Sequence, residues 1–349
     1  MNDPRILSLA TAVPRHRLRL DDVRDYARAK RSGHIEDFDR LIMIYGNAGV
    51  EERCSCVPLE WYGSPRGWVE KNALFLENAV ALLEEAASSA LAKAGLTPQQ
   101  VDWLVVVSTT GIATPDLGAR LMQVMPFRTE TRRLPIFGLG CAGGVLGLAR
   151  AADLARASPE ANVLLLVVEL CGLTFRYDDL SKNNVVATAL FSDGAVAAVL
   201  RAGGNGDAGP AIGAGGEHTW PNSLDVMGWR VEDDGLGVIF SRSIPQIVLT
   251  ELRPVADRFL AAHGLQLSDL DGLICHPGGA KVLDALAEAF APVSAGLDHA
   301  RTVMRERGNM SAASVLFVLE RMLADGARGR HLMSALGPGF TAGFALIDL

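Results

Sequence analysis

Short apolar runs, almost free of polar residues, recur along this chain and alternate with segments of helical periodicity. In the first part of the chain they occupy residues 101–107, 134–139, 163–169 and 195–201. Each run has the length of a β-strand, and strands that lack polar alternation are typical of a sheet covered by helices on both faces. The pattern therefore predicts an α/β fold.

The same rhythm returns in the second part of the chain. It follows a glycine-rich segment at 203–216, which we interpret as a linker or a turn between two halves. Helical patterns cover 245–263, 281–290 and 310–325, and apolar strand patterns cover 270–275, 331–336 and 341–347. Two halves with one rhythm, 1–205 and 206–349, suggest a pseudo-duplicated chain.

The composition supports a large folded core and argues against several classes of function. Of the 349 residues, 49% are hydrophobic, which is ample for an extensive core and unlike a disordered chain. A formal net charge of −7 gives no electrostatic reason to expect nucleic-acid binding. The apolar runs at 6–13 and 163–168 are too short for a membrane span, and the first has the wrong flanks for a secretion signal. The expected location is the cytoplasm.

Five cysteines are present, Cys54, Cys56, Cys141, Cys171 and Cys275, and no two of them have CxxC spacing. An odd number of cysteines in a cytosolic chain predicts reduced thiols. Cys54 and Cys56 form a CSC segment, which is a poor zinc-site spacing without further paired ligands. No metal site is expected.

Cys141 lies where an apolar run ends in glycines and a helical pattern begins, in the segment PIFGLGCAGGVLGLAR. A thiol in the first turn of a helix meets unpaired backbone N–H groups and the positive end of the helix dipole. Both favour the nucleophilic thiolate. The flanking glycines leave room for a substrate to approach. A buried core cysteine is an equally good interpretation of this segment alone, because free cysteine is among the most buried residue types.

Two more polar side chains lie at comparable junctions. His276 ends a predicted strand and precedes Pro277, which keeps it extended at the carboxyl end of the sheet, where α/β proteins usually place their chemistry. Asn309 precedes the predicted helix at 310–325. It either caps that helix or, if Ser311 forms the cap, points its amide at a ligand. A structural histidine and a capping asparagine are the simpler alternatives.

A cysteine, a histidine and an asparagine at such junctions suit carbon–carbon bond formation from thioesters. The thiolate takes up an acyl group, and the histidine and asparagine donate hydrogen bonds to a thioester oxygen as it becomes an enolate. Papain-like proteases use the same three residue types, but their cysteine has a different local signature, which this chain lacks.

The motifs around these residues resemble those of the type III polyketide synthases, relatives of chalcone and stilbene synthases within the thiolase superfamily. The matching pieces cover most of the chain after about residue 100: STTGIATPD (108–116), GLGCAGG (138–144), VELCGLTF (168–175), ALFSDGAVAAV (189–199), FSRSIP (240–245), CHPGG (275–279), RGNMSAAS (307–314) and GPGF (337–340). The resemblance implies a thiolase-like fold with two pseudo-duplicated halves in a layered α-β-α-β-α arrangement. It also implies a triad of Cys141, His276 and Asn309.

Further site residues follow from the same resemblance. Phe191 corresponds to the family's gatekeeper phenylalanine, which separates the coenzyme A tunnel from the catalytic cavity, and GPGF corresponds to the loop of the cyclisation pocket. The implied substrate-binding residues also include Thr109, Cys171, Thr174, Gly228, Val238, Ser311, Gly337, Pro338 and Gly339. The implied coenzyme A-binding residues are Arg53, Gly278, Gly279 and Lys281.

Three positions depart from the plant members of the family. The resemblance implies that the family's second gatekeeper phenylalanine is replaced near Val238, that Cys171 replaces a threonine that lines the cavity, and that Thr114 replaces a methionine that reaches across the dimer. The segments TTGIATPD, VELCGLTF and DDLS (178–181) are most similar to the bacterial enzymes that make alkylresorcinols and alkylpyrones from fatty-acyl starters.

The implied activity is that of an acyltransferase. It would load a fatty-acyl-coenzyme A starter on Cys141, condense it repeatedly with malonyl-coenzyme A, and cyclise the chain to an alkylpyrone or alkylresorcinol. The family is homodimeric and needs no metal or organic cofactor, so a cofactor-free homodimer is expected. The alternatives are a chalcone-synthase-like enzyme with another starter, a single-round β-ketoacyl carrier-protein synthase III, and a non-enzymatic acyl-binding module. The synthase III family has a different sequence around its histidine and lacks the GPGF loop.

Overall fold

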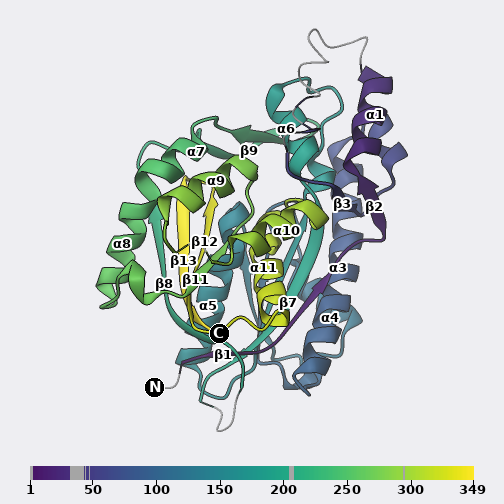
Figure 1. The fold of residues 1–349 in the computed structure, drawn as a ribbon. Coiled ribbons are helices and arrows are strands. Elements are labelled where there is room, and N and C mark those ends of the chain that lie inside the picture. The colour runs from purple at the N-terminus through teal and green to yellow at the C-terminus, as the bar shows by residue number, and fades with distance from the viewer. Residues whose placement is uncertain (1–2, 32–42, 44, 47, 204–207, 294) are drawn as a thin grey trace.

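The structure is a computed structural model that describes residues 3–31, 43, 45–46, 48–203, 208–293 and 295–349 (Figure 1). The strands are β1 (Arg5–Ala12), β2 (His16–Arg19), β3 (Glu52–Ser55), β4 (Trp103–Val107), β5 (Arg132–Ile136), β6 (Val163–Leu170), β7 (Asp193–Arg201), β8 (Ala211–Thr219), β9 (Met227–Glu232), β10 (Gly235–Phe240), β11 (Gly272–Cys275), β12 (Arg330–Gly337) and β13 (Thr341–Asp348). The helices are α1 (Leu20–Arg31), α3 (Trp68–Lys93), α4 (Leu117–Val124), α5 (Gly143–Ala157), α6 (Lys182–Leu190), α7 (Ile244–Ile247), α8 (Arg253–Ala262), α9 (Ala280–Ala289), α10 (Leu297–Arg307) and α11 (Ser314–Ala324). The apolar runs therefore form strands, and the periodic segments form helices.

One nine-stranded sheet, in the order β11-β12-β13-β8-β1-β7-β6-β4-β5, carries both halves of the chain. In the first half β4 is parallel to β6, β6 is antiparallel to β7, and β7 is antiparallel to β1. In the second half β11, β12, β13 and β8 follow one another with the same sequence of directions. The two halves therefore share a topology, as their common rhythm suggested. The division of the chain at 205/206 stays a prediction.

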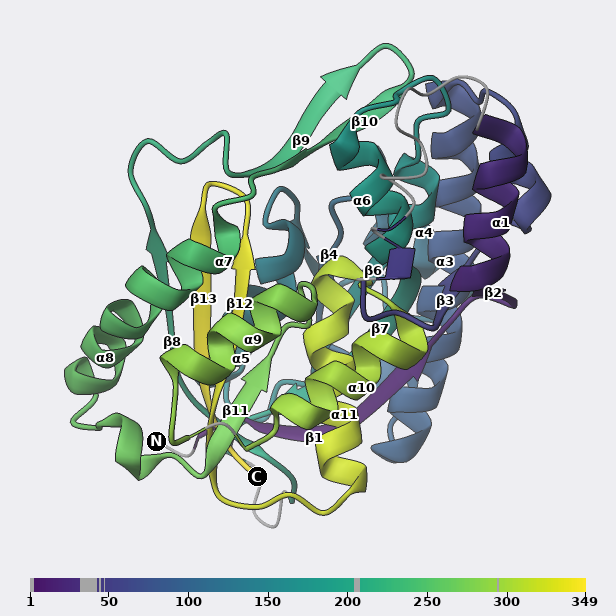
Figure 2. The same ribbon diagram turned by 45° about the horizontal axis from the view of Figure 1, so that its top comes forward.

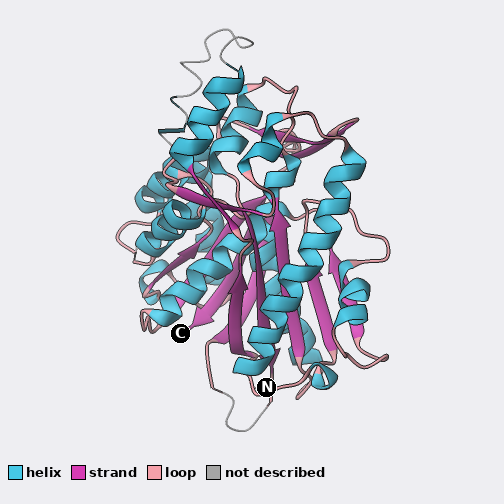
Figure 3. Ribbon diagram, turned by 90° about the vertical axis from the view of Figure 1, so that its right-hand side faces the viewer, coloured by secondary structure: helices cyan, strands magenta, loops and turns pink. Residues whose placement is uncertain are grey.

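The sheet and helices form the expected α-β-α-β-α layers. The central helix α5 packs against strands of both halves and against α11. The helices α3 and α4 cover the outer face of the first half (Figure 3). On the second half, α8 lies against β13, where the rings of Phe259 and Phe344 stack with their centroids 5.4 Å apart. Glycines let α5 approach its neighbours closely, because a Cβ at Gly144 would lie 2.1 Å from the carbonyl oxygen of Ala312.

Two element boundaries differ from the prediction. The glycine-rich segment 203–216 is not a linker throughout, because residues 211–216 belong to β8 and pair with β13. Its glycines serve packing: a Cβ at Gly215 would lie 2.7 Å from the Cβ of Ala149 on α5. Residues 204–207 of that segment lie outside the described residues. The strand expected over 134–139 ends at Ile136, and the chain then turns toward Cys141.

A hairpin of β9 and β10 lies beside α6 at one end of the molecule (Figure 2). Its tip is tied down at Asp234. The Nζ of Lys71 donates to the Asp234 carbonyl at 2.9 Å, and the Nε of Arg176 donates to the Asp234 carboxylate at 2.6 Å. These contacts hold the hairpin over the loops that carry the candidate residues. Among the described residues, none of the helices has the length and apolar character needed to cross a membrane.

Candidate active site

Cys141 lies in a short 3₁₀ turn, Gly140–Ala142, directly before α5. The backbone N–H of Gly140 donates to the Oγ1 of Thr109 at 3.1 Å, which ties the turn to the loop after β4. Gly140 has a φ of +46°, and a Cβ there would lie 2.6 Å from the ring of Pro338. Two of the predicted site residues, Thr109 and Pro338, therefore shape the turn that presents the thiol.

The other predicted glycines lie near this turn. A Cβ at Gly337 would lie 2.4 Å from the carbonyl oxygen of Leu139, so the GPGF loop packs directly on the cysteine turn. Gly228 on β9 faces the Pro338 ring across a gap of ordinary van der Waals size. The carbonyl of Gly339 accepts a hydrogen bond from the Oγ of Ser223 at 2.8 Å. The loop therefore forms one wall beside Cys141.

His276 follows β11 immediately, as predicted from the proline after it. Its backbone N–H donates to the carbonyl of Ser334 on β12 at 2.9 Å, which extends the strand pairing by one residue. The side chain is only 6% exposed, and neither ring nitrogen has a hydrogen-bond partner in the described part of the chain. A buried imidazole without partners is costly unless a ligand completes it.

Asn309 is fully buried and is held through its backbone. Its N–H donates to the Leu190 carbonyl at 2.8 Å, and its carbonyl accepts from the N–H of Ser192 at 2.9 Å, so it is fastened on either side of Phe191. The side-chain Oδ1 accepts from the N–H of Ser311 at 2.8 Å. The Nδ2 donor has no partner among the residues described. The amide oxygen thus stabilises the turn, and its nitrogen remains free to donate.

Of the two candidate caps for the following helix, Ser311 does not take that position. The N–H of Met310 instead donates to the Oγ of Ser314 at 2.7 Å. Ser311 has a φ of +47° in a 3₁₀ turn, and this conformation directs its hydroxyl to the carboxylate of Glu169, 3.4 Å away. The same hydroxyl hydrogen-bonds the thiol of Cys141. Ser311 is therefore a neighbour of the nucleophile.

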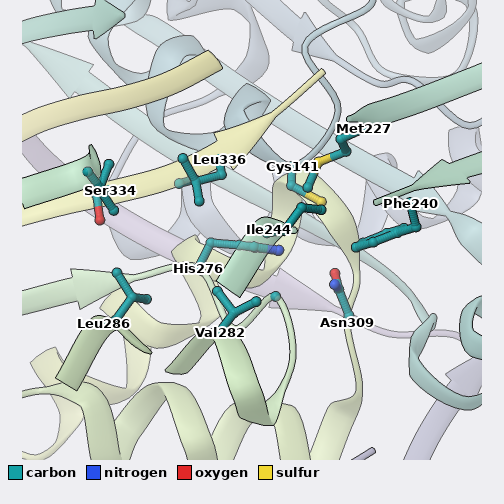
Figure 4. Close-up of a pocket in the computed structure, with 13 residues that line it drawn as sticks. Cys141, Met227, Phe240, Ile244, His276, Val282, Leu286, Asn309, Ser334 and Leu336 are labelled. Carbon is teal, nitrogen blue, oxygen red and sulfur yellow. The ribbon is translucent and has the colours of Figure 1, made fainter. Parts of the chain in front are cut away.

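Three loops that are far apart in the sequence bring Cys141, His276 and Asn309 to one cavity of about 30 Å³ (Figure 4). Its other walls are mostly apolar: Met227, Phe240, Ile244, Leu252, Gly278, Val282, Leu286, Ser334, Ala335 and Leu336. A thiol, an imidazole and an amide donor, the last two without partners among the described residues, thus face the same mostly apolar space. This arrangement can hold an acyl group on sulfur and donate hydrogen bonds to an oxygen beside it.

Burial sets the charge of this group. It raises the pKa of Cys141 to about 12 and lowers the pKa of His276 to about 3. The thiolate expected at the helix end stays a prediction, and burial of the thiol opposes it. Burial therefore favours the neutral thiol and the neutral imidazole over their charged forms. His276 is consequently in the form that can accept the thiol proton.

Glu169 is a buried carboxyl that we did not single out from the sequence. Glu169 is the only charged residue in the strand β6, and the other residues of that strand are all apolar. A single carboxyl in such a strand could have indicated a buried polar site from the sequence. The Oε2 of Glu169 accepts from the N–H of Thr109 and the Oγ1 of Thr110, both at 2.9 Å, and its Oε1 accepts from Ser311. Burial raises the pKa of Glu169 to about 7. Glu169 thus links the loop after β4 to the serine beside Cys141.

Glu169 should make the stability of the protein depend on pH. The pKa of Glu169 is raised from 4.5 to about 7, so the folded protein holds the proton of this carboxyl more tightly than the unfolded chain does. The protonated carboxyl therefore adds to the free energy of unfolding. This contribution is complete below about pH 4.5, decreases as the pH rises, and is lost above about pH 7. The variant Glu169→Gln does not titrate there. Between about pH 5 and pH 8, the wild type should lose about 3 kcal/mol more free energy of unfolding than the variant. Urea unfolding at the two pH values measures this difference, and equal losses would contradict it. Asp193 titrates in the wild type and in the variant, so its effect on the free energy of unfolding cancels when the two proteins are compared.

Aromatic side chains separate this cavity from its surroundings. The Phe191 ring lies with its centroid 6.0 Å from that of Trp229 on β9 and 6.2 Å from that of Phe240 on β10. Phe240 lines both the catalytic cavity and a larger pocket outside it. The family resemblance predicted a role for Val238, which lies two residues earlier on the same face of β10. Only the folded hairpin shows that Phe240 stands at the entrance.

The larger outer pocket has a volume of about 450 Å³ and carries three cationic side chains, Lys182, Arg242 and Lys281. Gly278 and Gly279 also line it, so three of the four residues predicted to bind coenzyme A lie together. The structure does not place Arg53 with them. Arg53 is 5% exposed on β3 and donates to the carbonyl groups of Thr188 and Phe191. Lys182 and Arg242 were not foreseen, because isolated surface cations carry no sequence pattern.

The remaining predicted residues, Cys171 and Thr174, line a second small cavity of about 20 Å³ together with Phe191 and Val238. The Oγ1 of Thr174 donates to the Cys171 carbonyl at 2.7 Å. Within the described part of the chain, no three side chains of His, Cys, Asp or Glu are grouped to hold a metal ion. The predicted residues therefore form a catalytic cavity, an adjoining polar cavity and an outer cationic pocket.

Comparison with known proteins assigns the family. The family model for the N-terminal domain of chalcone and stilbene synthases matches residues 63–204, and the model for their C-terminal domain matches residues 214–347. The chain belongs to the chalcone and stilbene synthase family. Its fold and its candidate site can therefore be compared with those of type III polyketide synthases.

Similar proteins of this family come from bacteria. A 1,3,6,8-tetrahydroxynaphthalene synthase of Streptomyces peucetius subsp. caesius is 39% identical over 98% of this chain and 92% of its own length. A phloroglucinol synthase of Pseudomonas fluorescens is 28% identical over 95% of both chains. The crystal structure of 1,3,6,8-tetrahydroxynaphthalene synthase from Streptomyces coelicolor A3(2), a bacterial type III polyketide synthase, matches 99% of both chains with a TM-score of 0.90 and 30% identity. The protein is thus a type III polyketide synthase with a thiolase-like fold, and its class is that of the acyl-condensing transferases.

Proposed function

We propose that this enzyme loads an aliphatic acyl group from coenzyme A on Cys141, extends it repeatedly with malonyl-coenzyme A, and cyclises the chain to an alkylpyrone or alkylresorcinol. The observation that carries the proposal is the set of free groups in the catalytic cavity. The two ring nitrogens of His276 and the Nδ2 of Asn309 have no partner among the described residues, and they face the cavity that holds the thiol. A thioester oxygen supplies the acceptor that these groups lack.

Loading begins with a proton transfer. The imidazole of His276 accepts the proton of the Cys141 thiol, and the thiolate attacks the thioester carbonyl of the starter. Coenzyme A leaves as its thiol, taking the proton from His276. Cys141 then carries the acyl group, and His276 is neutral again. The cationic side chains of the outer pocket suit the phosphates of coenzyme A, while the pantetheine arm passes Phe240 toward the cavity.

Extension uses the same two hydrogen-bonding residues. Malonyl-coenzyme A loses carbon dioxide, and the electron pair of the broken bond becomes an enolate whose oxygen accepts from Asn309 Nδ2 and from His276. The enolate carbon attacks the acyl thioester on Cys141, and the thiolate leaves. The extended chain returns to Cys141 for another round. No metal or organic prosthetic group is required in this scheme, because the loss of carbon dioxide drives the condensation.

The apolar lining of the catalytic cavity supports an aliphatic starter. Ile244, Leu252, Val282, Leu286 and Leu336 offer no hydrogen bonds to a polar starter, and they surround the space next to Cys141. The free volume of about 30 Å³ requires these side chains to move apart for any chain longer than a few carbons. The family matches favour this iterative activity over a single-round synthase III and over an acyl-binding module.

Incubation with malonyl-coenzyme A and one starter at a time tests the proposal. Acetyl-, hexanoyl-, dodecanoyl- and benzoyl-coenzyme A form a suitable panel, with products identified by mass spectrometry. We expect the aliphatic starters to give pyrones or resorcinols that retain the alkyl chain, and benzoyl-coenzyme A to give little product. An enzyme that incorporates no acyl starter and makes its product from malonyl-coenzyme A alone would contradict the proposed starter class.

We also propose that the enzyme is a homodimer that joins along β5. This strand is the last of the sheet, and its outer edge is unpaired among the described residues. Next to it, Phe137 is 61% exposed and Ile112 is 50% exposed, which is unusual for large apolar side chains at an open strand edge. Light scattering should give twice the mass of one chain, and Phe137→Asp should lower it. A wild type with the mass of a single chain would contradict the dimer.

A further inference from the structure

Arg53 is a buried cation whose hydrogen-bonding capacity is mostly unused. Its side chain belongs to β3 and is 95% withdrawn from solvent. The hydrogen bonds it makes to described residues all come from one terminal nitrogen, Nη1, which donates to the carbonyls of Thr188 and Phe191. Its Nε is buried without a partner in the described structure, and no carboxylate there forms an ion pair with it. A guanidinium buried in this way is costly unless an anionic or strongly polar group completes it.

Asp193 lies near Arg53 but does not neutralise it directly. The Asp193 carboxylate accepts from the backbone N–H of Gly172 at 2.7 Å and of Cys56 at 2.9 Å. Burial raises the pKa of Asp193 to about 6, and the charge of Arg53 lowers it in part. The guanidinium therefore keeps free donors on its other side.

Arg53 lines the small cavity that lies behind Phe191. The cavity has a volume of about 20 Å³ and includes Tyr62, Cys171, Thr174 and Val238 in its walls. This is room for a group of about the size of one water molecule. Its walls are partly apolar, like those of the catalytic cavity, but they also include the cation of Arg53 and the phenol of Tyr62, which the described walls of the catalytic cavity lack. The two cavities thus differ in the chemistry that they accept.

The polar cavity lies next to the nucleophile. Cys171 is one of its walls, and burial raises the pKa of Cys171 strongly, with the charges of Glu169, Asp193 and Cys141 raising it further. The ring of Phe191 packs against that of Phe240, with their centroids 6.2 Å apart, and Phe240 lines the catalytic cavity. Phe191, another wall, is joined through its backbone to Asn309. The Phe191 ring lies between the polar cavity and Phe240, which lines the catalytic cavity, so a chain attached to Cys141 would enter the polar cavity if that ring turned aside.

We propose that this polar cavity is a subsite for an acidic oxygen of the chain that grows on Cys141, and that Arg53 binds this oxygen. The inference rests on the proposed function, because only an extended chain places such oxygens beside the cysteine. The carbon between two carbonyls of a β-keto chain is acidic, so the chain readily presents an enolate oxygen. A chain held by Arg53 stays extended and is kept from folding back on its own thioester. Arg53 thereby favours a further round of extension over early lactonisation.

A product ratio tests the proposal. The wild type, Arg53→Met and Arg53→Lys are each supplied with hexanoyl-coenzyme A and malonyl-coenzyme A. The ratio of longer to shorter polyketides is measured by mass spectrometry, and the rate of starter transfer to Cys141 is measured from the mass of the intact protein. Arg53→Met should lower the ratio by about tenfold or more, because a charge-assisted hydrogen bond is lost. The loading rate should change little, and Arg53→Lys should recover much of the ratio.

A second set of reactions with malonyl-coenzyme A alone distinguishes two sources of the oxygen. If Arg53 binds the enolate oxygen of a β-keto chain, the product ratio of the hexanoyl reaction should depend on Arg53. If Arg53 binds the terminal carboxylate of a malonyl starter, only the product ratio of the malonyl reaction should depend on it. Either result supports the subsite. Unchanged ratios in both reactions overturn it, and so does a loss of loading in parallel with extension, because that result indicates a merely structural role.

Matched variants separate these outcomes from misfolding and from failure of the proposed function. Arg17→Met removes a half-exposed arginine of the neighbouring strand β2 and should leave the product ratio unchanged. Should Arg53→Met not fold, Val238→Phe fills the same cavity from β10 and should lower the ratio without touching Arg53. A wild type that makes no product in either reaction overturns the proposed function together with this subsite. An active wild type whose ratio ignores both variants overturns the subsite alone.

Discussion

Replacing Cys141 by alanine is expected to abolish acyl transfer to the protein and the formation of any polyketide. Cys141 is the only thiol among the described residues that line the catalytic cavity with His276 and Asn309, so its loss should lower product formation by at least about 10⁴-fold. The starter appears on the wild type as an added acyl mass on the intact protein. The variant should show no such mass.

The Cys141→Ala variant should still decarboxylate malonyl-coenzyme A. His276 and Asn309 remain in the Cys141→Ala variant, so malonyl-coenzyme A should still be converted slowly to acetyl-coenzyme A. Cys56 provides a matched control, because it is 9% exposed against 7% for Cys141 and lies outside the cavity. Cys56→Ala should load and extend like the wild type. A Cys141→Ala enzyme that elongates a starter at the wild-type rate would refute the assignment of the nucleophile.

Replacing Asn309 by alanine should impair decarboxylation far more than loading. The Nδ2 of Asn309 is a free donor in a dry cavity, and loss of one such donor to an enolate costs about 10²–10³ in rate. Loading needs the proton exchange between Cys141 and His276 and does not use this donor. The two rates are measured separately, as carbon dioxide released from malonyl-coenzyme A and as acyl mass gained by the protein.

Asn309→Asp distinguishes the missing donor from a disturbed turn. Aspartate keeps an oxygen that accepts from the N–H of Ser311, which alanine leaves unpaired at a cost in stability. In its ionised form it lacks the donor and repels the enolate. Burial raises the pKa of a carboxyl at this position, so decarboxylation is measured at a pH that ionises it, where both variants should lose the activity. Asn162→Ala, a buried asparagine before β6, is the control that should retain both rates. Equal losses of loading and decarboxylation would contradict the division of roles.

Much of the architecture was predictable because its signals are local. The apolar run that became β6 has no polar alternation, and it is buried along its whole length, as the pattern required. His276 was placed correctly because a proline restricts the residue before it. The exception in 203–216 has a local cause as well: glycines that resemble a linker in sequence were in fact needed for the close approach of α5 to β8.

Site residues that act through space were harder to predict. Phe240 was missed because its role depends on where the β9–β10 hairpin comes to rest, and the contacts at Asp234 that hold the hairpin join three distant segments. Arg53 resembled a phosphate-binding cation in sequence, whereas in the fold it faces the end of α6 from a buried strand. A surface arginine and a buried arginine look the same in the sequence, because the residues that surround the side chain come from other parts of the chain.

The sequence by itself determined the family, the α/β fold with repeated halves, and the three residues that meet at the catalytic cavity. These follow from periodicity and from motifs around Cys141, His276 and Asn309, which depend on neighbours along the chain. The burial of Cys141 and His276, the surroundings of the Glu169 carboxyl, and the division into catalytic, polar and outer cavities became visible in the fold alone. The physical reason is desolvation: how far water is excluded from a thiol, an imidazole or a guanidinium depends on the segments that pack around it, and those segments are distant in sequence.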